Sequence, residues 1–295
     1  MPAQLFRRKG VDEATSDAEA PEQRLKRTLG PIDLTALGIG AIIGAGIFSS
    51  TGTAAAGGAD HIGAGPALMA SYALTAIACG FAALCYAELA SMIPIAGSAY
   101  TYSYVTLGEF LAWIIGWDLI LEYAVGNIAV AVSWSGYFRD FLGGFGLHLP
   151  AWMATTINHA RDTPGLLASA PHVFGIPIVL NFPALAIVAL LTVLLVIGVK
   201  ESARLNSVMV GLKIVLVLGF VAVGAFYVQP ANWHPFAPHG FTGVMTGASI
   251  IFFSYIGFDA ISTTAEEARN PQRDLPIGLI ASLLICTVIY VAVTA

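Results

Sequence analysis

Residues 38–48 read GIGAIIGAGIF, and residues 250–262 read IIFFSYIGFDAIS. Each stretch lies inside a long apolar run and has a glycine near its centre, Gly44 in the first and Gly257 in the second. Glycine costs about 1 kcal/mol relative to alanine inside a helix, so repeated glycine indicates either close helix packing or an interrupted helix. The spacing of Gly40 and Gly44 fits packing, but a second glycine-centred run favours interruption of both helices.

The composition predicts a membrane protein. Apolar residues make up 57% of the chain and charged residues only 11%, against roughly a quarter in soluble domains. Eleven of the 31 charged residues lie between Arg7 and Arg27, so residues 1–30 are expected to form a disordered, solvated tail rather than a secretory signal. The three cysteines lie in apolar runs without paired spacing, which suggests neither disulfides nor a metal site. No feature indicates nucleic-acid binding.

Seven apolar runs are long enough to be considered as membrane spans, since a bilayer core about 30 Å thick needs about 20 residues of helix. The runs are continuously apolar rather than alternating, so helices are expected and a β-barrel is not. The predicted transmembrane domain covers residues 31–295, with helices at about 32–55, 66–90, 104–137, 183–199, 206–228, 241–264 and 275–295.

The distribution of Lys and Arg orients these helices. With the N-terminus in the cytoplasm, ten of these residues fall inside and only Arg139 and Arg161 outside, while Lys213 lies within a span. This satisfies the positive-inside rule and predicts a multi-pass protein of the cell membrane, with residues 138–182 as an external loop. The last apolar run reaches Ala295 without a polar stop, so the chain is expected to be a fragment.

Interrupted helices would free backbone groups in the bilayer interior, where each unpaired group costs several kcal/mol. A zwitterionic α-amino acid satisfies both kinds of group: the N–H groups that begin one half-helix suit its carboxylate, and the carbonyls that end another suit its ammonium. Two glycine-interrupted runs also suit the opening helices of two structural repeats, between which transporters bind substrate. The expected substrate-binding residues are Ile42, Ile43, Gly44, Ala45, Gly46, Phe253, Ser254, Tyr255, Ile256 and Gly257. Of these, Phe253 and Tyr255 are expected to face the substrate side chain.

Ionisable residues within spans are functional candidates, because each is costly at the bilayer centre. Asp118 and Glu122 are four residues apart on the third run and share one helix face, and Asp259 follows the second interruption. They either line a side-chain pocket or link polar groups between helices. Lys213 either snorkels to the membrane surface or points into the bundle, where it could act as a protonatable switch.

Residues 266–276, EEARNPQRDLP, form the densest polar cluster outside the tail. Pro271 and Pro276 predict a turn that ends one helix and starts the next. The cluster is either a solvated turn or, through Glu266, a gate that docks against the inner end of the first helix.

Five motifs in this order resemble the cationic amino acid transporter branch of the amino acid, polyamine and organocation superfamily. They are GIGAIIGAGIF, YAELASMIPIAGSAYTY (86–102), GWDLILEYAVG (116–126), the Lys213 span and FFSYIGFDAISTTAEEARNPQRDLP (252–276). The resemblance covers about residues 27–295. It implies an all-α membrane protein with a leucine-transporter-like fold of two inverted five-helix repeats, of which this chain contains the N-terminal part.

The resemblance also implies roles for individual residues. It assigns the substrate carboxylate to Ala45 and Gly46, and the amine to the carbonyls of Ile42, Phe253, Ser254 and Ile256. Lys213 falls where bacterial members have a lysine thought to replace sodium, which implies proton coupling. Glu122 and Asp259 match acidic positions that face the side-chain pocket.

The sequence therefore predicts a secondary transporter for an α-amino acid, coupled to protons, without cofactor or metal. An amino-acid antiporter and a non-transporting amino-acid receptor stay open as alternatives, because interrupted helices would serve both. An enzyme is not expected, because no grouping of nucleophile, base and orienting residue is present. The amino acid carried and the oligomeric state are not indicated.

Overall fold

The computed structural model describes residues 7–11, 25–58, 60–197 and 199–295. These residues form helices almost throughout, and the chain divides into two compact units. The first unit combines Met1–Ile120 with Val210–Ala295, and the second is Leu121–Met209. The unit boundaries fall within two long helices, α7 (Glu109–Gly144) and α11 (Val199–Gly224).

Five helical segments of the described residues are long and apolar enough to cross a membrane, and two further apolar helices are shorter. The protein is thus an all-α, multi-pass membrane protein. The five segments are Pro31–Ala56, Gly65–Met92, Glu109–Gly144, Gly240–Glu267 and Pro271–Thr294, and the two shorter ones are Phe182–Ile197 and Val208–Gly224.

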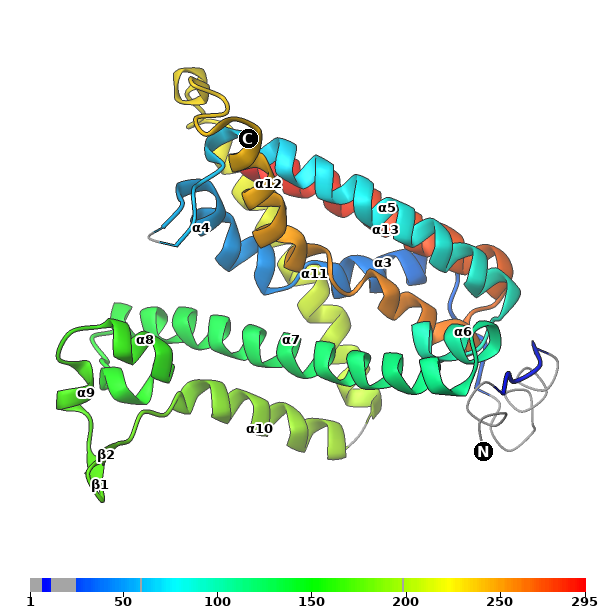
Figure 1. The fold of residues 1–295 in the computed structure, drawn as a ribbon, viewed down its shortest axis with the longest axis horizontal. Coiled ribbons are helices and arrows are strands. Elements are labelled where there is room, and N and C mark those ends of the chain that lie inside the picture. The colour runs from blue at the N-terminus through cyan, green and yellow to red at the C-terminus, as the bar shows by residue number, and fades with distance from the viewer. Residues whose placement is uncertain (1–6, 12–24, 59, 198) are drawn as a thin grey trace. The chain divides into compact units, whose positions relative to one another are not determined.

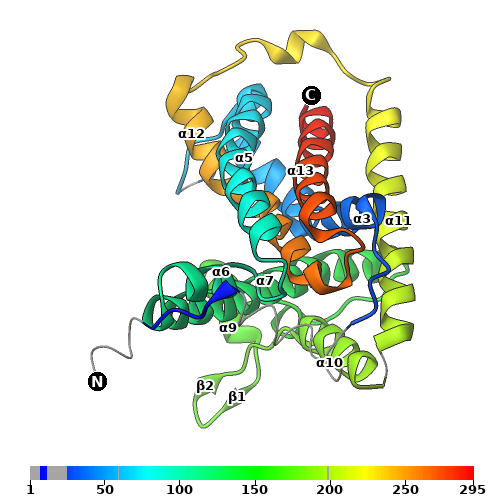
Figure 2. The ribbon, with the colours of Figure 1, turned by 90° about the vertical axis from the view of Figure 1, so that its right-hand side faces the viewer.

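In the first unit, α13 (Pro271–Thr294) packs along both α5 (Leu68–Met92) and α3 (Pro31–Ile42) (Figures 1 and 2). Helix α12 (Gly240–Ile251) packs against α5 and α4 (Thr51–Ala56). The unit also contains η1 (Gly46–Ser50), η2 (Gly65–Ala67), α6 (Ser98–Thr106), η4 (Pro230–Trp233), η5 (Phe252–Tyr255) and η6 (Phe258–Glu267).

The second unit contains the long connection between α7 and α10 (Phe182–Ile197). Helix α7 continues to Gly144, so it extends beyond the expected end of the third run at residue 137. The connection then forms η3 (Ala151–Met153), α8 (Ile157–Asp162), α9 (Leu166–Ser169) and an antiparallel hairpin of β1 (His172–Val173) and β2 (Ile176–Pro177).

The third expected run, 104–137, differs most from the structure. Its first residues belong to a separate helix, α6, and α7 begins only at Glu109. Gly108 lies between them with φ +105°, a backbone conformation that glycine adopts without the penalty of a side chain. The residues here, YVTLGEF (104–110), include Thr106 and Glu109, but hydropathy averaged over a whole span hides so short a polar interruption.

The end of the expected N-terminal tail is bound to the first unit. The N–H groups of Thr28 and Leu29 donate to the carbonyl of Glu267 at 2.9 and 3.0 Å, and the N–H of Arg269 donates to Leu29 at 2.9 Å. Residues 28–30 are thus held beside the end of η6, unlike the solvated tail expected for 1–30. Residues 1–6 and 12–24 of that tail lie outside the described residues.

Small residues allow α3 and α13 to approach closely. A Cβ added at Gly278 of α13 would lie 2.9 Å from Leu34 Cβ on α3. A Cβ added at Gly38 of α3 would lie 2.8 Å from Ser282 Cβ on α13. Gly38 of the first span therefore serves close helix packing, which is a different position from the Gly40 and Gly44 pair considered in the sequence.

Gly278→Ala is expected to lower the free energy of unfolding by about 1–3 kcal/mol, because an extra methyl group overpacks this contact. Gly80→Ala is the matched control, since a Cβ at Gly80 of α5 meets nothing within 4 Å. The measurement is the apparent melting temperature of the purified protein in detergent, followed by intrinsic fluorescence. Equal melting temperatures for the two variants would contradict the close contact.

Candidate functional site

The two glycine-centred runs form interrupted helices that lie against each other in opposite directions. Helix α3 contacts η6, whereas η1 and α4 contact η5 and α12 (Figure 1). The end of one interrupted helix therefore lies beside the beginning of the other. This arrangement brings the two interruptions together in the interior of the first unit.

Both interruptions are short stretches of non-helical backbone. Helix α3 ends at Ile42, and Ile43 takes φ −72° and ψ +88° before the helix resumes at η1. In the second, η5 ends at Tyr255, and Ile256 takes φ −58° and ψ +137°. Gly257 follows with φ +110°, which only glycine adopts readily. The breaks thus lie at the glycines that the sequence singles out.

The breaks interlock through their glycines. A Cβ added at Gly46 would lie 2.6 Å from Ser254 Cα, which belongs to the other break. A Cβ added at Gly257 would lie 2.8 Å from the carbonyl oxygen of Ala41, next to the first break. Each glycine therefore allows the backbone of the opposite helix to approach, and larger residues at these positions would separate the two breaks.

Lys213 of α11 binds the carbonyl end of α3. Its Nζ donates to the carbonyl oxygen of Ile43 at 2.6 Å and also to that of Gly40. The side chain of Lys213 therefore points into the bundle instead of snorkelling to the surface. A cation at the C-terminal end of a helix is favoured by the helix dipole and by the unsatisfied carbonyls there.

Tyr290 of α13 joins the two breaks. Its hydroxyl oxygen lies 3.0 Å from the carbonyl oxygen of Ile42 and 2.9 Å from that of Ser254. The side chain is fully buried. Tyr290 is not among the residues that the sequence predicted for the site. A tyrosine within an apolar run is nevertheless a signal, because a buried phenol needs a hydrogen-bond partner.

Three buried tyrosines from different helices pack around this point. The ring centroid of Tyr290 lies 5.2 Å from that of Tyr72 and 5.4 Å from that of Tyr255. The Tyr255 hydroxyl donates to the Tyr72 carbonyl at 3.1 Å. Tyr255 thus packs into the protein core, and the expectation that it faces a substrate side chain does not fit its position.

The amide groups at the first break have a different environment from the carbonyls. Gly44, Ala45 and Gly46 precede or begin a helical segment, whose first N–H groups have no acceptor in a preceding turn. Within the described residues, no acceptor from another element is found for these amides. The carbonyl side of the break is therefore bound by Lys213 and Tyr290, whereas the amide side has the kind of groups that bind an anion.

The other candidate residues lie away from this point. Asp259 is buried and accepts a hydrogen bond from Ser98 Oγ of α6 at 3.2 Å, as expected of a polar link between helices. Glu266 accepts from the N–H of Ala96 at 3.1 Å, in the turn between α5 and α6. This contact places Glu266 in a turn, and its alternative role as a gate against the first helix stays a prediction.

Asp118 and Glu122 share one helix, α7, but belong to different units. Asp118 belongs to the first unit and Glu122 to the second, because the boundary follows Ile120. Both side chains are exposed within their own units. Their place in a side-chain pocket stays a prediction.

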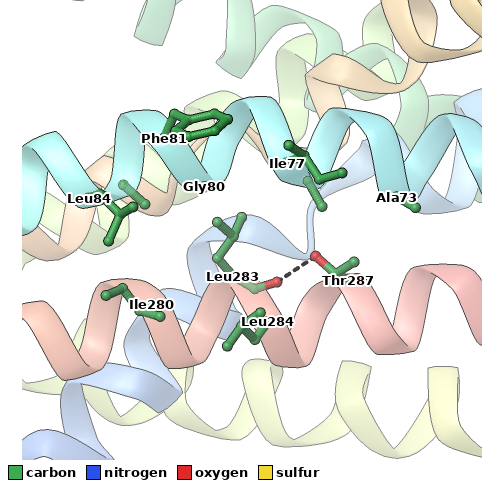
Figure 3. Close-up of a pocket in the computed structure, with 11 residues that line it drawn as sticks. Ala73, Ile77, Gly80, Phe81, Leu84, Ile280, Leu283, Leu284 and Thr287 are labelled. Atoms are coloured by element: carbon green, nitrogen blue, oxygen red, sulfur yellow. Dashed lines mark hydrogen bonds between the residues drawn. The ribbon is translucent and has the colours of Figure 1, made fainter.

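One cavity of about 480 Å³ lies between α5 and α13 (Figure 3). Side chains such as Ile77, Phe81 and Leu284 line it, and the Thr287 hydroxyl donates to the Leu283 carbonyl of its own helix at 2.7 Å. An apolar surface of this kind suits hydrocarbon and offers little to a charged ligand. The two breaks, rather than this cavity, have the polar groups needed to bind a zwitterion.

Comparison with known proteins identifies the family. The family model for amino acid permeases matches residues 29–295. The chain is 51% identical to the branched-chain amino acid permease BcaP of Bacillus subtilis, over 100% of this chain and 59% of the relative. It is 49% identical to the methylthioribose transporter of the same organism, over 98% of this chain and 58% of the relative.

A plant relative belongs to the same group. The chain is 43% identical to the chloroplastic cationic amino acid transporter 9 of Arabidopsis thaliana, over 91% of this chain and 44% of the relative. The chain thus spans about half the length of these relatives. These matches point to a transport protein rather than an enzyme, and the chain belongs to the amino acid permease family of the amino acid, polyamine and organocation superfamily.

Proposed function

We propose that the protein transports an α-amino acid across the cell membrane by proton-coupled symport, through alternating access to a site between its two interrupted helices. The observation that carries the proposal is the meeting of both breaks in the interior of one unit, with carbonyls from both helices converging on one hydroxyl. Membership of the amino acid permease family supports the same function.

In this proposal, the first break binds the substrate carboxylate and both breaks bind its ammonium. The N–H groups of Ala45 and Gly46, at the start of a helical segment, receive the carboxylate. The ammonium donates to the carbonyls of Ile42, Phe253, Ser254 and Ile256. Ile43 is no longer needed as a ligand, because its carbonyl oxygen is bound by Lys213 at 2.6 Å.

Lys213 couples transport to protons in this proposal. Protonated, its ammonium group donates to two carbonyls at the end of α3, and such charge-assisted hydrogen bonds are about twice as strong as neutral ones. Loss of the proton weakens both bonds and releases α3 from α11. Movement of α3 would open the first break at the carbonyl end of α3, which Lys213 otherwise binds.

The arrangement in the membrane follows from the same proposal. The N-terminus is cytoplasmic, and α12 with η6 opens the second inverted repeat of a leucine-transporter-like fold. The pairing of Thr28 and Leu29 with Glu267 and Arg269 then lies at the cytoplasmic end, where it restrains α3 and η6 together. Glu266 binds the turn between α5 and α6 at the same end. Asp118, Glu122 and Asp259 line or support the side-chain pocket.

One relative suggests a second substrate class. The relative named as a methylthioribose transporter is 49% identical, almost as similar as the branched-chain amino acid permease. Carriage of a methylthioribose-like substrate is therefore the second candidate function. Excess unlabelled methylthioribose and excess branched-chain amino acid, compared as competitors in one uptake assay, distinguish the two.

Full-length protein in liposomes is expected to accumulate labelled branched-chain amino acid when an inward proton gradient is imposed, because protonation of Lys213 is coupled to the loaded carrier. Uptake is measured with and without a protonophore, and a sodium gradient is the control. Accumulation driven by sodium alone would contradict proton coupling. Uptake that requires internal amino acid but no gradient would indicate an antiporter, and binding without counterflow would indicate a receptor.

Lys213→Met is expected to reduce gradient-driven uptake to background, because methionine keeps the length of the side chain but cannot bind a proton or donate to α3. Lys213→Arg is the matched variant, since arginine keeps the hydrogen bonds but stays protonated. We expect Lys213→Arg to retain thermal stabilisation by substrate while losing uptake. Unchanged uptake by Lys213→Met would exclude the coupling role.

A further inference from the structure

We propose that Tyr290 is the positioning residue that serves the substrate's ammonium site whenever the carrier crosses the membrane empty. Its single phenol proton is shared between the carbonyls of the two breaks in the absence of substrate, and the substrate ammonium becomes their donor on binding. This inference rests on the proposed amino-acid transport and concerns its return step.

The geometry gives Tyr290 access to both breaks at once. Its hydroxyl oxygen is 3.0 Å from the Ile42 carbonyl oxygen and 2.9 Å from that of Ser254, and these two residues belong to different interrupted helices. Both carbonyls lie at ends of helical segments, where no regular following turn provides a donor. Tyr290 is therefore the donor from a third helix that ties the two breaks together.

A phenol serves this pair of carbonyls only in part. A tyrosine hydroxyl has one proton, so it can donate fully to one of the two oxygens at a time. An ammonium group has three N–H donors and can satisfy both oxygens simultaneously. Once the ammonium is bound, the hydroxyl can turn its proton away and accept one of the ammonium N–H groups. The substrate thus completes hydrogen bonds that Tyr290 only half supplies.

The surrounding core keeps the hydroxyl in place. The Tyr290 ring is fully buried between Tyr72 of α5 and Tyr255 of η5, at centroid distances of 5.2 and 5.4 Å. Helix α13 also packs along α3 through Gly278. The phenol oxygen is therefore held at the breaks by packing, and its proton is the part that is free to rotate.

The consequence for transport is an asymmetry between loaded and empty carriers. In an occluded carrier, water no longer reaches the break carbonyls, and an unsatisfied carbonyl in an apolar interior is costly. The loaded carrier has the ammonium as donor, so it does not depend on the phenol proton. Among the residues that the structure describes, the empty carrier has Tyr290 as the side-chain donor to these two carbonyls. Net uptake requires the empty carrier to return, whereas exchange of one amino acid for another does not.

The test is Tyr290→Phe in liposomes containing full-length protein, with net uptake and counterflow exchange measured side by side. Net uptake is expected to fall roughly tenfold, which is the scale of one unsatisfied buried group, while exchange stays within about twofold of wild type. Tyr72→Phe is the matched control. It removes a hydroxyl from the same cluster, but one that bonds Thr51 Oγ1 at 3.0 Å and faces the side chain of Ser254 instead of a break carbonyl. The break carbonyls keep their donor, so the ratio of net uptake to exchange should not change.

A second variant keeps the volume of the side chain. Tyr290→4-aminophenylalanine has two N–H donors in place of one O–H, so it can hold both carbonyls without substrate. The substrate concentration for half-maximal exchange is then expected to rise roughly tenfold, because the ammonium gains less by binding. An unchanged value would overturn the proposal.

The outcomes separate this inference from the proposed function. Equal losses of net uptake and exchange in Tyr290→Phe would make Tyr290 a structural residue only, and an unaffected variant would remove it from the site. Either result overturns the inference and leaves amino-acid transport intact. Absence of both uptake and exchange in the wild-type protein would instead refute the proposed function.

Discussion

The structure of the first unit depends on satisfying backbone carbonyls where two helices are interrupted inside an apolar interior. No water is available in the bilayer core to bind such groups, so protein donors must be present. Lys213 binds the carbonyls of Gly40 and Ile43, and the Tyr290 hydroxyl lies between those of Ile42 and Ser254. These two side chains make the breaks compatible with a folded membrane protein.

The packing of three helices brings these donors to the breaks. Helix α13 reaches the site because small residues, among them Gly38 and Gly278, let it lie close to α3. The two interrupted helices approach each other because Gly46 and Gly257 have no side chains at their contact. The glycines of these runs therefore have two functions. Some allow the helix to be interrupted, and others allow neighbouring helices to approach the interruption.

The same hydrogen bonds connect structure to the proposed transport. The lysine ammonium and the phenol that bind the breaks are hydrogen-bond donors, as the ammonium of an α-amino acid is. A substrate can therefore compete with the protein's own donors for the same carbonyls, and a proton on Lys213 changes how firmly one helix end is held. Membership of the amino acid permease family agrees with a site of this kind.

The sequence by itself determined the features that depend on local composition. It indicated a helical membrane protein and the positions of both breaks at Gly44 and Gly257, because hydropathy and glycine conformation are properties of each segment. It also singled out Lys213 as an ionisable residue within a span, but left open whether its side chain snorkels to the surface or points into the bundle. It missed the junction at Gly108, because hydropathy averaged over a whole span hides the short polar interruption at Thr106 and Glu109.

Only the tertiary structure decided which groups meet at the breaks. Tyr290 is 248 residues from Ile42 in the chain, and no local pattern connects them. Tyr255 binds the Tyr72 carbonyl of α5, 183 residues away, and Glu266 binds Ala96 in the turn after α5, 170 residues away. The sequence pattern indicated neither partner. Hydrogen-bond partners depend on which helices pack together and on how closely their small residues let them approach, and that is a property of the assembled fold.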